Sequence, residues 1–319
     1  MDTSSLKSLK TLKNQHVISA KQFNRELTEN LLNRSAQLES EIKAKGKLDI
    51  LKGRVVALLF CEASTRTSCS FATAIMKLGA DVLNVSWENS SAKKGETMQD
   101  TLRTLEGFSD AIVMRHPEKG IHEKMKPYLK NPIFNAGDGA GEHPTQALLD
   151  IYTIYRELGG LDGLTLTLLG DLKYGRTVHS LLKLLSLFNG LTVNLVCPEN
   201  LQFPEEILND IGKDGIKNIK INHSTELTNE IVASTDVLYV TRLQRERFTN
   251  DADFLKIKSG YNVSKETLKS AKDKMIVMHP LPRVDELNED MDSDPRAAYF
   301  KQVAYGVFMR AALLEAVLA

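Results

Sequence analysis

The stretch Glu62-Ala63-Ser64-Thr65-Arg66-Thr67-Ser68 stands between an apolar run at residues 55–60 and a helix-like run at residues 71–78. This order predicts a buried strand that ends in a polar turn and then opens a helix. The first N–H groups of a helix have no intrahelical partner and the helix dipole is positive there, so such a turn binds anions. A single hydroxyl would be explained by helix capping, but a cap does not need several hydroxyls around one arginine. The turn therefore predicts a phosphate cradle formed by Ser64, Thr65, Arg66 and Thr67.

The alternation of short apolar runs with helical runs continues along the chain and predicts parallel sheets covered by helices. The expected strands fall into two series, at residues 55–60, 82–85, 111–114 and 132–134, and at residues 165–169, 192–196, 219–222, 237–240 and 275–278. We expect the fold class to be α/β, with two open parallel-sheet domains, the first at residues 1–142 and the second at residues 143–293. The C-terminal helix, at residues 294–319, is expected to return to the first domain.

Helix boundaries are predicted from capping residues. Ser19 and Gln22 form a capping-box pair, which predicts that the first long helix begins at Ser19. Asp294 as cap, with Pro295 at the favoured first position, predicts that the closing helix runs from there to Leu318.

Composition excludes several classes of partner. The 319 residues contain 41 Lys and Arg and 41 Asp and Glu, so no net charge favours nucleic acid or an anionic membrane, and no apolar run reaches the length of a membrane span. Cys61, Cys69 and Cys197 form an odd set without paired spacing, which indicates a reducing compartment and favours the cytoplasm. Neither a Cys/His ligand cluster nor an activated Ser/His/Asp set is present, so we expect no metal and no cofactor.

Three further motifs, two in the first domain and one at the start of the second, have both a structural and a functional interpretation. The segment at residues 90–96 contains Ser90 and Lys94 and is either a solvated loop or a mobile clamp for a phosphate. Arg115 follows a strand, where it is either salt-bridged or part of a ligand site at the sheet edge. His143 and Gln146 share one face of a helix N-terminus, after a glycine-rich segment. They are either structural or able to bind a ligand that has a carbonyl and an NH₂ group.

Three motifs of the second domain also follow expected strands. Residues 170–177 resemble a phosphate-binding P-loop, but Arg176 stands where that loop needs lysine, so we consider an NTPase weakly supported. Arg242 and Gln244 share one side of an extended segment and could hold a carboxylate beside an amide, although charged segments after strands are commonly solvated. His279-Pro280-Leu281-Pro282-Arg283 leaves backbone carbonyls such as that of Leu281 able to accept from an amine.

Taken together, the motifs resemble those of the aspartate carbamoyltransferases, in the same order and over nearly the whole chain. They are Ser-Thr-Arg-Thr, Lys-Lys-Gly-Glu-Thr, Arg-His-Pro, His-Pro-Thr-Gln, Gly-Asp-Leu-Lys-Tyr-Gly-Arg-Thr, Thr-Arg-x-Gln-x-Glu-Arg and His-Pro-Leu-Pro-Arg. The related ornithine enzymes typically have cysteine where Pro280 stands. Ser68 departs from many bacterial members, which have arginine there, but it matches animal-type members.

The resemblance implies a role for each motif. The expected catalytic residues are Arg66, Thr67, Arg115 and His143. The expected ligands of carbamoyl phosphate are Ser64, Thr65, Arg66, Thr67, Ser90, Lys94, Arg115, His143, Gln146, Leu281 and Pro282. The expected ligands of L-aspartate are Lys94, Arg176, Arg242 and Gln244. The resemblance also implies a homotrimer whose active sites are shared, because the loop with Ser90 and Lys94 enters the neighbouring subunit's site.

The implied reaction is carbamoyl transfer from carbamoyl phosphate to L-aspartate, the second step of de novo pyrimidine biosynthesis, and association with a larger assembly of that pathway is possible. Two alternatives stay open. One is a carbamoyltransferase for another amino acid such as ornithine, although Arg176 and Arg242 suit a dicarboxylate better. The other is a catalytically silent assembly subunit, against which the intact Arg66, Arg115 and His143 speak.

Overall fold

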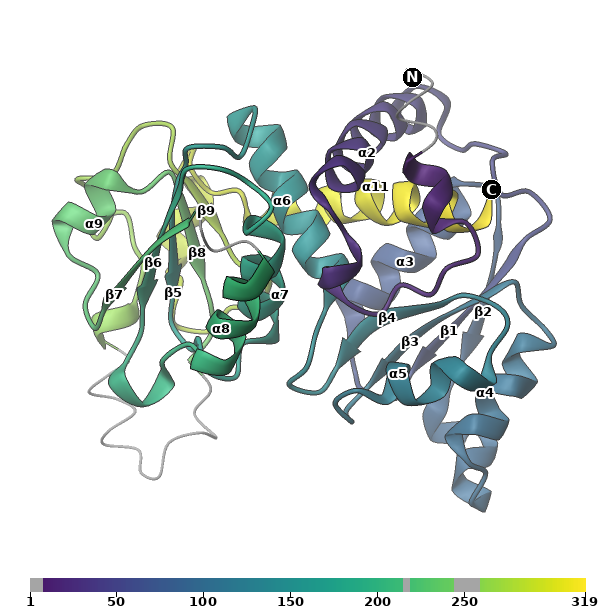
Figure 1. Cartoon of the computed structure of the whole chain (residues 1–319). Coiled ribbons are helices and arrows are strands. Elements are labelled where there is room, and N and C mark those ends of the chain that lie inside the picture. Colours follow the sequence, from purple (N-terminus) through teal and green to yellow (C-terminus); the bar gives the residue numbers. More distant parts are fainter. Residues whose placement is uncertain (1–7, 215–218, 244–258) are drawn as a thin grey trace. The chain divides into compact units, whose positions relative to one another are not determined.

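The computed structural model describes residues 8–214, 219–243 and 259–319. The chain divides into two compact units, one made of Met1–Tyr152 with Val303–Ala319 and the other of Thr153–Gln302. Each unit contains one parallel sheet with helices beside it (Figure 1). The predicted fold class, two open parallel-sheet α/β domains, is confirmed. Over the described residues, no helix combines the length and the apolar character that crossing a bilayer requires.

The sheet of the first unit has four strands in the order β2-β1-β3-β4. The strands are β1 (Val55–Phe60), β2 (Asp81–Val85), β3 (Ala111–His116) and β4 (Ile133–Asp138). The α-helices of this part of the chain are α2 (Arg25–Lys45), α3 (Thr65–Lys77), α4 (Met98–Glu106), α5 (Ile121–Met125), α6 (Pro144–Leu158) and α11 (Tyr299–Leu318). The last two cross from one unit to the other, since the chain passes between the units after Tyr152 and after Gln302.

Helices cover the central strands of this sheet, which is why β1 and β3 are almost continuously apolar. Phe71 of α3 packs edge-on against Phe134 of β4, with ring centroids 6.3 Å apart. The C-terminal helix α11 is bound to α2 by an ion pair in which Arg34 donates from Nε and Nη2 to the two carboxylate oxygens of Glu315, at 2.6 and 2.8 Å. The predicted return of this helix to the first domain is confirmed.

The sheet of the second unit has five strands in the order β7-β6-β5-β8-β9. The strands are β5 (Thr165–Leu169), β6 (Leu191–Val196), β7 (Ile219–Ser224), β8 (Val237–Val240) and β9 (Ile276–Met278). The α-helices are α7 (Arg176–Leu185), α8 (Glu205–Asp214) and α9 (Asn229–Ser234). Short 3-10 helices in the two units occupy Lys10–Leu12, Ala20–Gln22, Trp87–Asn89, Ser91–Lys94, Lys126–Tyr128, Glu199–Leu201, Ser259–Tyr261 and Glu289–Ser293.

The ends of every predicted strand except one lie within two residues of the observed ends. The exception is β4, predicted to stop at Phe134 but continuing to Asp138, so the glycine-rich segment begins inside the strand. Two pairings extend it. The N–H of Asn135 donates to the carbonyl of Val17, and Asp138 pairs with His116 after a register shift. Both pairings depend on residues distant in the sequence, which local pattern does not reveal.

The predicted start of the first long helix was wrong. Ser19 and Gln22 do form a capping box, but it caps the short 3-10 helix Ala20–Gln22. The long helix α2 begins at Arg25, where the side chain of Asn24 accepts a hydrogen bond from the N–H of Leu27 at 2.8 Å. A good cap was therefore assigned to the wrong helix.

The predicted start of the closing helix was also wrong, because α11 begins at Tyr299 rather than Pro295. The preceding residues pair with β9 instead: the N–H of Val277 donates to Arg296, and the N–H of Ala298 donates back to Val277. The side chain of Asp294 binds the guanidinium of Arg296 at 2.8–2.9 Å rather than capping a helix. Tertiary pairing thus overrides a favourable Asp-Pro signal.

Candidate active site

The predicted anion turn leads from β1 into α3. Ser64 is the N-cap residue of α3, yet its side chain makes no capping hydrogen bond, so helix capping does not explain this hydroxyl. Thr65 and Arg66 are exposed, whereas Thr67 is buried. The turn thus offers a helix N-terminus, accessible hydroxyls and a guanidinium, which is the combination that binds a phosphate group.

Thr67 is brought to His143 across 76 residues of sequence. The Oγ1 atom of Thr67 lies 3.4 Å from Nε2 of His143, and both side chains are almost fully buried. His143 directly precedes Pro144, the first residue of α6, so the first turn of α3 and the start of α6 meet here. Two motifs that are far apart in the sequence are therefore neighbours in the fold.

Arg115 belongs to β3, which lies between β1 and β4 in the sheet. It pairs in register with Phe60 at the end of β1, and its side chain is only 12% exposed. Its Nε donates to Oε2 of Glu62 at 2.8 Å, and its Nη1 lies 3.5 Å from the carbonyl oxygen of Ala136. The salt-bridged interpretation of this arginine is thus confirmed. The ion pair also holds the guanidinium at the same sheet edge as the anion turn.

The loop that carries His143 is fastened by two carboxylates. Asp138 accepts hydrogen bonds from the N–H groups of Gly120 at 2.8 Å and Glu142 at 2.5 Å, so it joins the turn after β3 to the loop after β4. Glu142 in turn accepts from the hydroxyl of Ser19 at 2.9 Å and the N–H of Ala20 at 2.8 Å. These bonds fix the backbone immediately before His143.

The close packing of this loop yields a stability prediction. Gly139 has φ +52°, and a Cβ atom there would lie 2.2 Å from the carbonyl oxygen of Pro117; Gly120 has φ +78° and open space around it. Gly120→Ala should cost about 1–2 kcal/mol of unfolding free energy, from the left-handed backbone alone. Gly139→Ala should cost about 2 kcal/mol more, because the loop must also move. Urea unfolding of both variants measures the difference, and equal losses would contradict this account of the loop.

Ser90 and Lys94 lie in the segment after β2, the edge strand of the sheet. Ser90 ends one 3-10 helix and caps the next, and its hydroxyl donates to the carbonyl of Trp87 at 2.8 Å. Lys94 is exposed. In the described part of the chain, neither side chain forms a hydrogen bond or ion pair with the residues of the anion turn.

Two of the predicted aspartate ligands, Arg176 and Arg242, follow the carboxyl ends of β5 and β8 in the second unit. Arg176 is the first residue of α7, after a turn in which Asp171 Oδ1 accepts from the N–H groups of Lys173 and Tyr174 at 3.1 and 3.0 Å. Arg242 is exposed and follows Thr241, whose N–H and hydroxyl both donate to the carbonyl of Leu169. These two hydrogen bonds join the end of β8 to the end of β5. Gln244 lies outside the described residues.

The predicted backbone ligands Leu281 and Pro282 follow β9, and the peptide bond between them is cis. The N–H of Leu281 donates to Nδ1 of the buried His279 at 2.8 Å, and Nε2 of His279 lies 2.7 Å from Oε1 of Glu286. Since Nδ1 is the acceptor, Nε2 carries the proton and donates to the carboxylate. Burial favours a higher pKa of Glu286, but the hydrogen bond from His279 and those from the N–H groups of Glu286 and Val284 outweigh it, so the pKa of this carboxyl is lowered.

The sequence analysis missed the carboxylates that hold these residues in place. Glu62, Asp138 and Glu286 orient Arg115, the loop before His143, and the backbone at Leu281, respectively. Each of these carboxylates lies at or near the end of a strand or motif. Their closeness in the sequence to a predicted cationic or backbone ligand was the feature from which they could have been predicted. The partner of each carboxylate could not be assigned without the fold.

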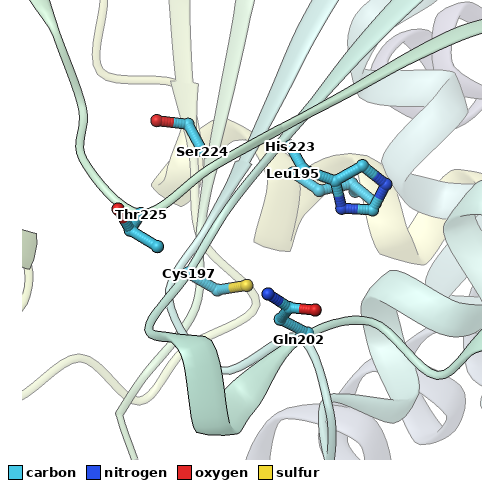
Figure 2. A pocket seen from close by; sticks show the side chains of 6 residues that line it. All are labelled: Leu195, Cys197, Gln202, His223, Ser224 and Thr225. Atoms are coloured by element: carbon cyan, nitrogen blue, oxygen red, sulfur yellow. The ribbon is translucent and has the colours of Figure 1, made fainter.

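A cavity of about 330 Å³ lies elsewhere in the second unit, at the carboxyl ends of β6 and β7 (Figure 2). It is lined by Leu195, Cys197, Gln202, His223, Ser224 and Thr225. Burial raises the pKa of the Cys197 thiol to about 11, so this thiol is protonated at neutral pH and is not a nucleophile. Among the residues that the structure describes, no predicted site residue lines this cavity.

Two family models match the chain. The aspartate/ornithine carbamoyltransferase carbamoyl-P binding domain matches residues 15–156, and the Asp/Orn binding domain matches residues 162–317. The aspartate carbamoyltransferase catalytic subunit of Archaeoglobus fulgidus is 47% identical over 305 residues, which are 95% of this chain and 99% of that protein. The crystal structure of Trypanosoma cruzi aspartate transcarbamoylase in complex with carbamoyl phosphate has a TM-score of 0.95 and 46% identity and covers 100% of both chains.

The chain also matches part of a much longer protein. It is 46% identical over 308 residues to the multifunctional protein pyr-3 of Neurospora crassa. The matched region is 97% of this chain but only 17% of that protein. The two family models together span nearly the whole chain. The sequence identity to the Archaeoglobus protein, 47% over almost its full length, is well above the level that shows membership of a family. The chain belongs to the aspartate/ornithine carbamoyltransferase family.

Proposed function

We propose that this protein is an aspartate carbamoyltransferase. It transfers the carbamoyl group of carbamoyl phosphate to the α-amino group of L-aspartate, which gives N-carbamoyl-L-aspartate and phosphate, the second step of de novo pyrimidine biosynthesis. The observation that carries the proposal is the convergence of the anion turn, Arg115 and His143 at the carboxyl edge of the first sheet. The similarity to an aspartate carbamoyltransferase catalytic subunit over nearly its full length supports it.

In this proposal carbamoyl phosphate binds to the first domain, residues 1–142 with the C-terminal helix 294–319, with further ligands from residues 143–146 and 281–282. Arg66 and the N-terminus of α3 take the phosphate, because a planar guanidinium and oriented N–H groups match its oxygens. Thr67, Arg115 and His143 surround the carbonyl oxygen, which becomes negatively charged in the reaction. Other ligands are Ser64, Thr65, Gln146, Leu281 and Pro282.

The second domain, residues 143–293, binds the carboxylates of aspartate in this proposal. Arg176 at the start of α7 and Arg242 after β8 provide two guanidinium groups. A dicarboxylate needs two such groups, whereas a cationic side chain such as that of ornithine would be repelled by them. Gln244 and Lys94 complete the aspartate site.

The reaction requires one bond to form and one to break. The uncharged α-amino group attacks the carbonyl carbon and forms the C–N bond, and negative charge develops on the carbonyl oxygen. Thr67, Arg115 and His143 stabilise that charge. The C–O bond to phosphate then breaks, and the departing phosphate takes up the proton from the amine.

The proposed enzyme is a cytoplasmic homotrimer with shared active sites. The exposed Lys94 and its neighbour Ser90 act in the site of an adjacent subunit, which is consistent with the lack of bonds to their own anion turn among the described residues. A cytoplasmic location is supported by three free cysteines. A larger pyrimidine-pathway assembly is a further proposal, since the Neurospora relative is a multifunctional protein.

An amino-acid panel tests the proposed function. The purified protein with carbamoyl phosphate should carbamoylate L-aspartate at least about 100-fold faster than ornithine or other amino acids that lack a second carboxylate, because only a dicarboxylate pairs with both arginines. Colorimetric detection of the carbamoyl amino acid measures this. Preference for ornithine would support the alternative acceptor, and a folded protein without turnover would support the silent subunit.

A further inference from the structure

The side-chain amide of Gln146 has its orientation dictated by Asp150, one helical turn later in α6. Nε2 of Gln146 donates to Oδ1 of Asp150 at 2.9 Å, and Asp150 is fully buried. An ionised carboxylate accepts hydrogen bonds but donates none, so the NH₂ side of the amide must face it. The Oε1 atom of Gln146 is therefore turned away from Asp150. Gln146 is thereby set to present a hydrogen-bond acceptor.

Arg310 of α11 is a buried cation whose charge acts electrostatically on Asp150, without a direct hydrogen bond between the two described side chains. Arg310 is 3% exposed, and its Nη1 donates to the hydroxyl of Ser70 in α3 at 2.7 Å. Its guanidinium carbon lies 5.0 Å from the centre of the Phe71 ring. Burial lowers the pKa of Arg310 to about 10, and Asp150 opposes this lowering, so the side chain stays charged at neutral pH. A buried cation of this kind is what a buried carboxylate requires.

The absence of a side chain at Gly306 leaves space for the guanidinium of Arg310. A Cβ atom at Gly306, one helical turn before Arg310, would lie 2.8 Å from its Nη1. Arg310 also joins α11 to α3, the helix that begins with the anion turn, and α11 passes beside α3 in Figure 1. Asp150 and Arg310 thus contact α6 and α3, the two helices that begin at the proposed carbamoyl phosphate site, although neither residue belongs to the predicted ligand set.

We propose that Asp150, supported by Arg310, is a positioning residue that selects carbamoyl phosphate over other acyl phosphates. It holds the Gln146 amide so that Oε1 accepts a hydrogen bond from the NH₂ group of the carbamoyl moiety. Acetyl phosphate has a methyl group at this position and would leave the buried acceptor unpaired, which is unfavourable. This inference rests on the proposed function and names a determinant of its substrate class.

Asp150→Asn tests the proposal, because asparagine has nearly the same shape but can present either a donor or an acceptor to Gln146. The measured quantity is selectivity, the inhibition constant of acetyl phosphate divided by KM for carbamoyl phosphate, with aspartate as acceptor. We expect Asp150→Asn to lower the selectivity about tenfold, mainly by raising KM for carbamoyl phosphate. The inhibition constant of acetyl phosphate should change less than about twofold, since it makes no such bond.

A double-mutant cycle separates positioning from a merely structural role. In a Gln146→Leu background there is no amide to orient, so Asp150→Asn should change the selectivity by less than about twofold. Asp150→Asn combined with Arg310→Met removes both charges and provides a second variant in case the single one does not fold. The selectivity of this double variant should fall by about the same factor as that of Asp150→Asn.

Three outcomes would overturn the proposal. The first is that Asp150→Asn and the double variant both keep the native selectivity. The second is that they weaken the binding of carbamoyl phosphate and acetyl phosphate equally, and the third is that Asp150→Asn lowers the selectivity equally with and without Gln146. These outcomes leave the proposed function intact if the native enzyme turns over carbamoyl phosphate and aspartate. Absence of that turnover in the native enzyme would instead overturn both the function and this inference.

Discussion

Replacement of Arg115 by alanine is expected to lower kcat about 100- to 1000-fold, because the loss of one oxyanion donor commonly has an effect of this size. Arg115 lies at the carboxyl end of β3, in register with the end of β1, and its side chain is mostly buried. The proposed function places the carbonyl oxygen of carbamoyl phosphate, which gains negative charge in the reaction, beside this guanidinium. Steady-state kinetics at saturating substrates, with the unfolding temperature as a folding check, measures the effect.

Two companion variants show whether this effect is catalytic. Arg54 forms an exposed ion pair with Asp110 at the amino end of β1, the opposite edge of the same sheet, at 2.7 Å. Arg54→Ala should leave kcat within about twofold of the native value, since exposed ion pairs contribute little. Glu62→Ala breaks the ion pair of Arg115 but keeps the guanidinium. If Glu62→Ala reduced kcat as much as Arg115→Ala, Arg115 would act through its ion pair rather than on the substrate.

Mixing two inactive variants is expected to restore activity if the active site is shared between subunits. Arg66→Ala and Lys94→Ala should each lose at least about 100-fold in turnover, since each lacks one cation around the phosphate. In randomly mixed trimers, about a quarter of the sites combine an intact Arg66 with an intact Lys94 from the neighbour. The mixture should therefore recover about a quarter of the native specific activity. Joint refolding of the two variants followed by an activity assay measures this recovery.

The matched control mixes Arg66→Ala with Arg115→Ala. Both residues belong to the first unit and converge on the same sheet edge, so they must come from one subunit. No mixed trimer then contains a complete site, and no recovery is expected. Equal recovery in both mixtures, or none in either, would contradict a site completed by the neighbouring Lys94.

Local patterns in the sequence predicted the strands and the strand ends after which the candidate site residues stand. The run at residues 55–60 became β1 with the predicted ends, and the hydroxyls and arginine after it follow directly at the start of α3. The reason is that strand burial, turn chemistry and helix initiation are short-range properties. Parallel strands then bring their carboxyl ends to one edge, which is why separate motifs could be expected to meet.

Long-range partners could not be predicted in the same way. Arg310 and Ser70 are 240 residues apart, and Ser19 and Glu142 are 123 apart. Nothing in the local sequence of Asp150 distinguishes it from a solvated helical carboxylate, yet it is fully buried. The prediction of where α11 starts was wrong for the same reason, since residues 296–298 pair with β9 instead of forming part of the helix. Such contacts depend on packing between distant segments.

The most direct test of the account is a crystal structure of the protein with N-(phosphonacetyl)-L-aspartate, which joins analogues of both substrates in one molecule. We expect the phosphonate to contact Arg66 and the N-terminus of α3, with Lys94 from a neighbouring subunit. The two carboxylates of the same molecule should contact Arg176 and Arg242. A bound analogue that touches neither Arg66 nor Arg242, or that occupies only one of the two clusters, would contradict the proposed site.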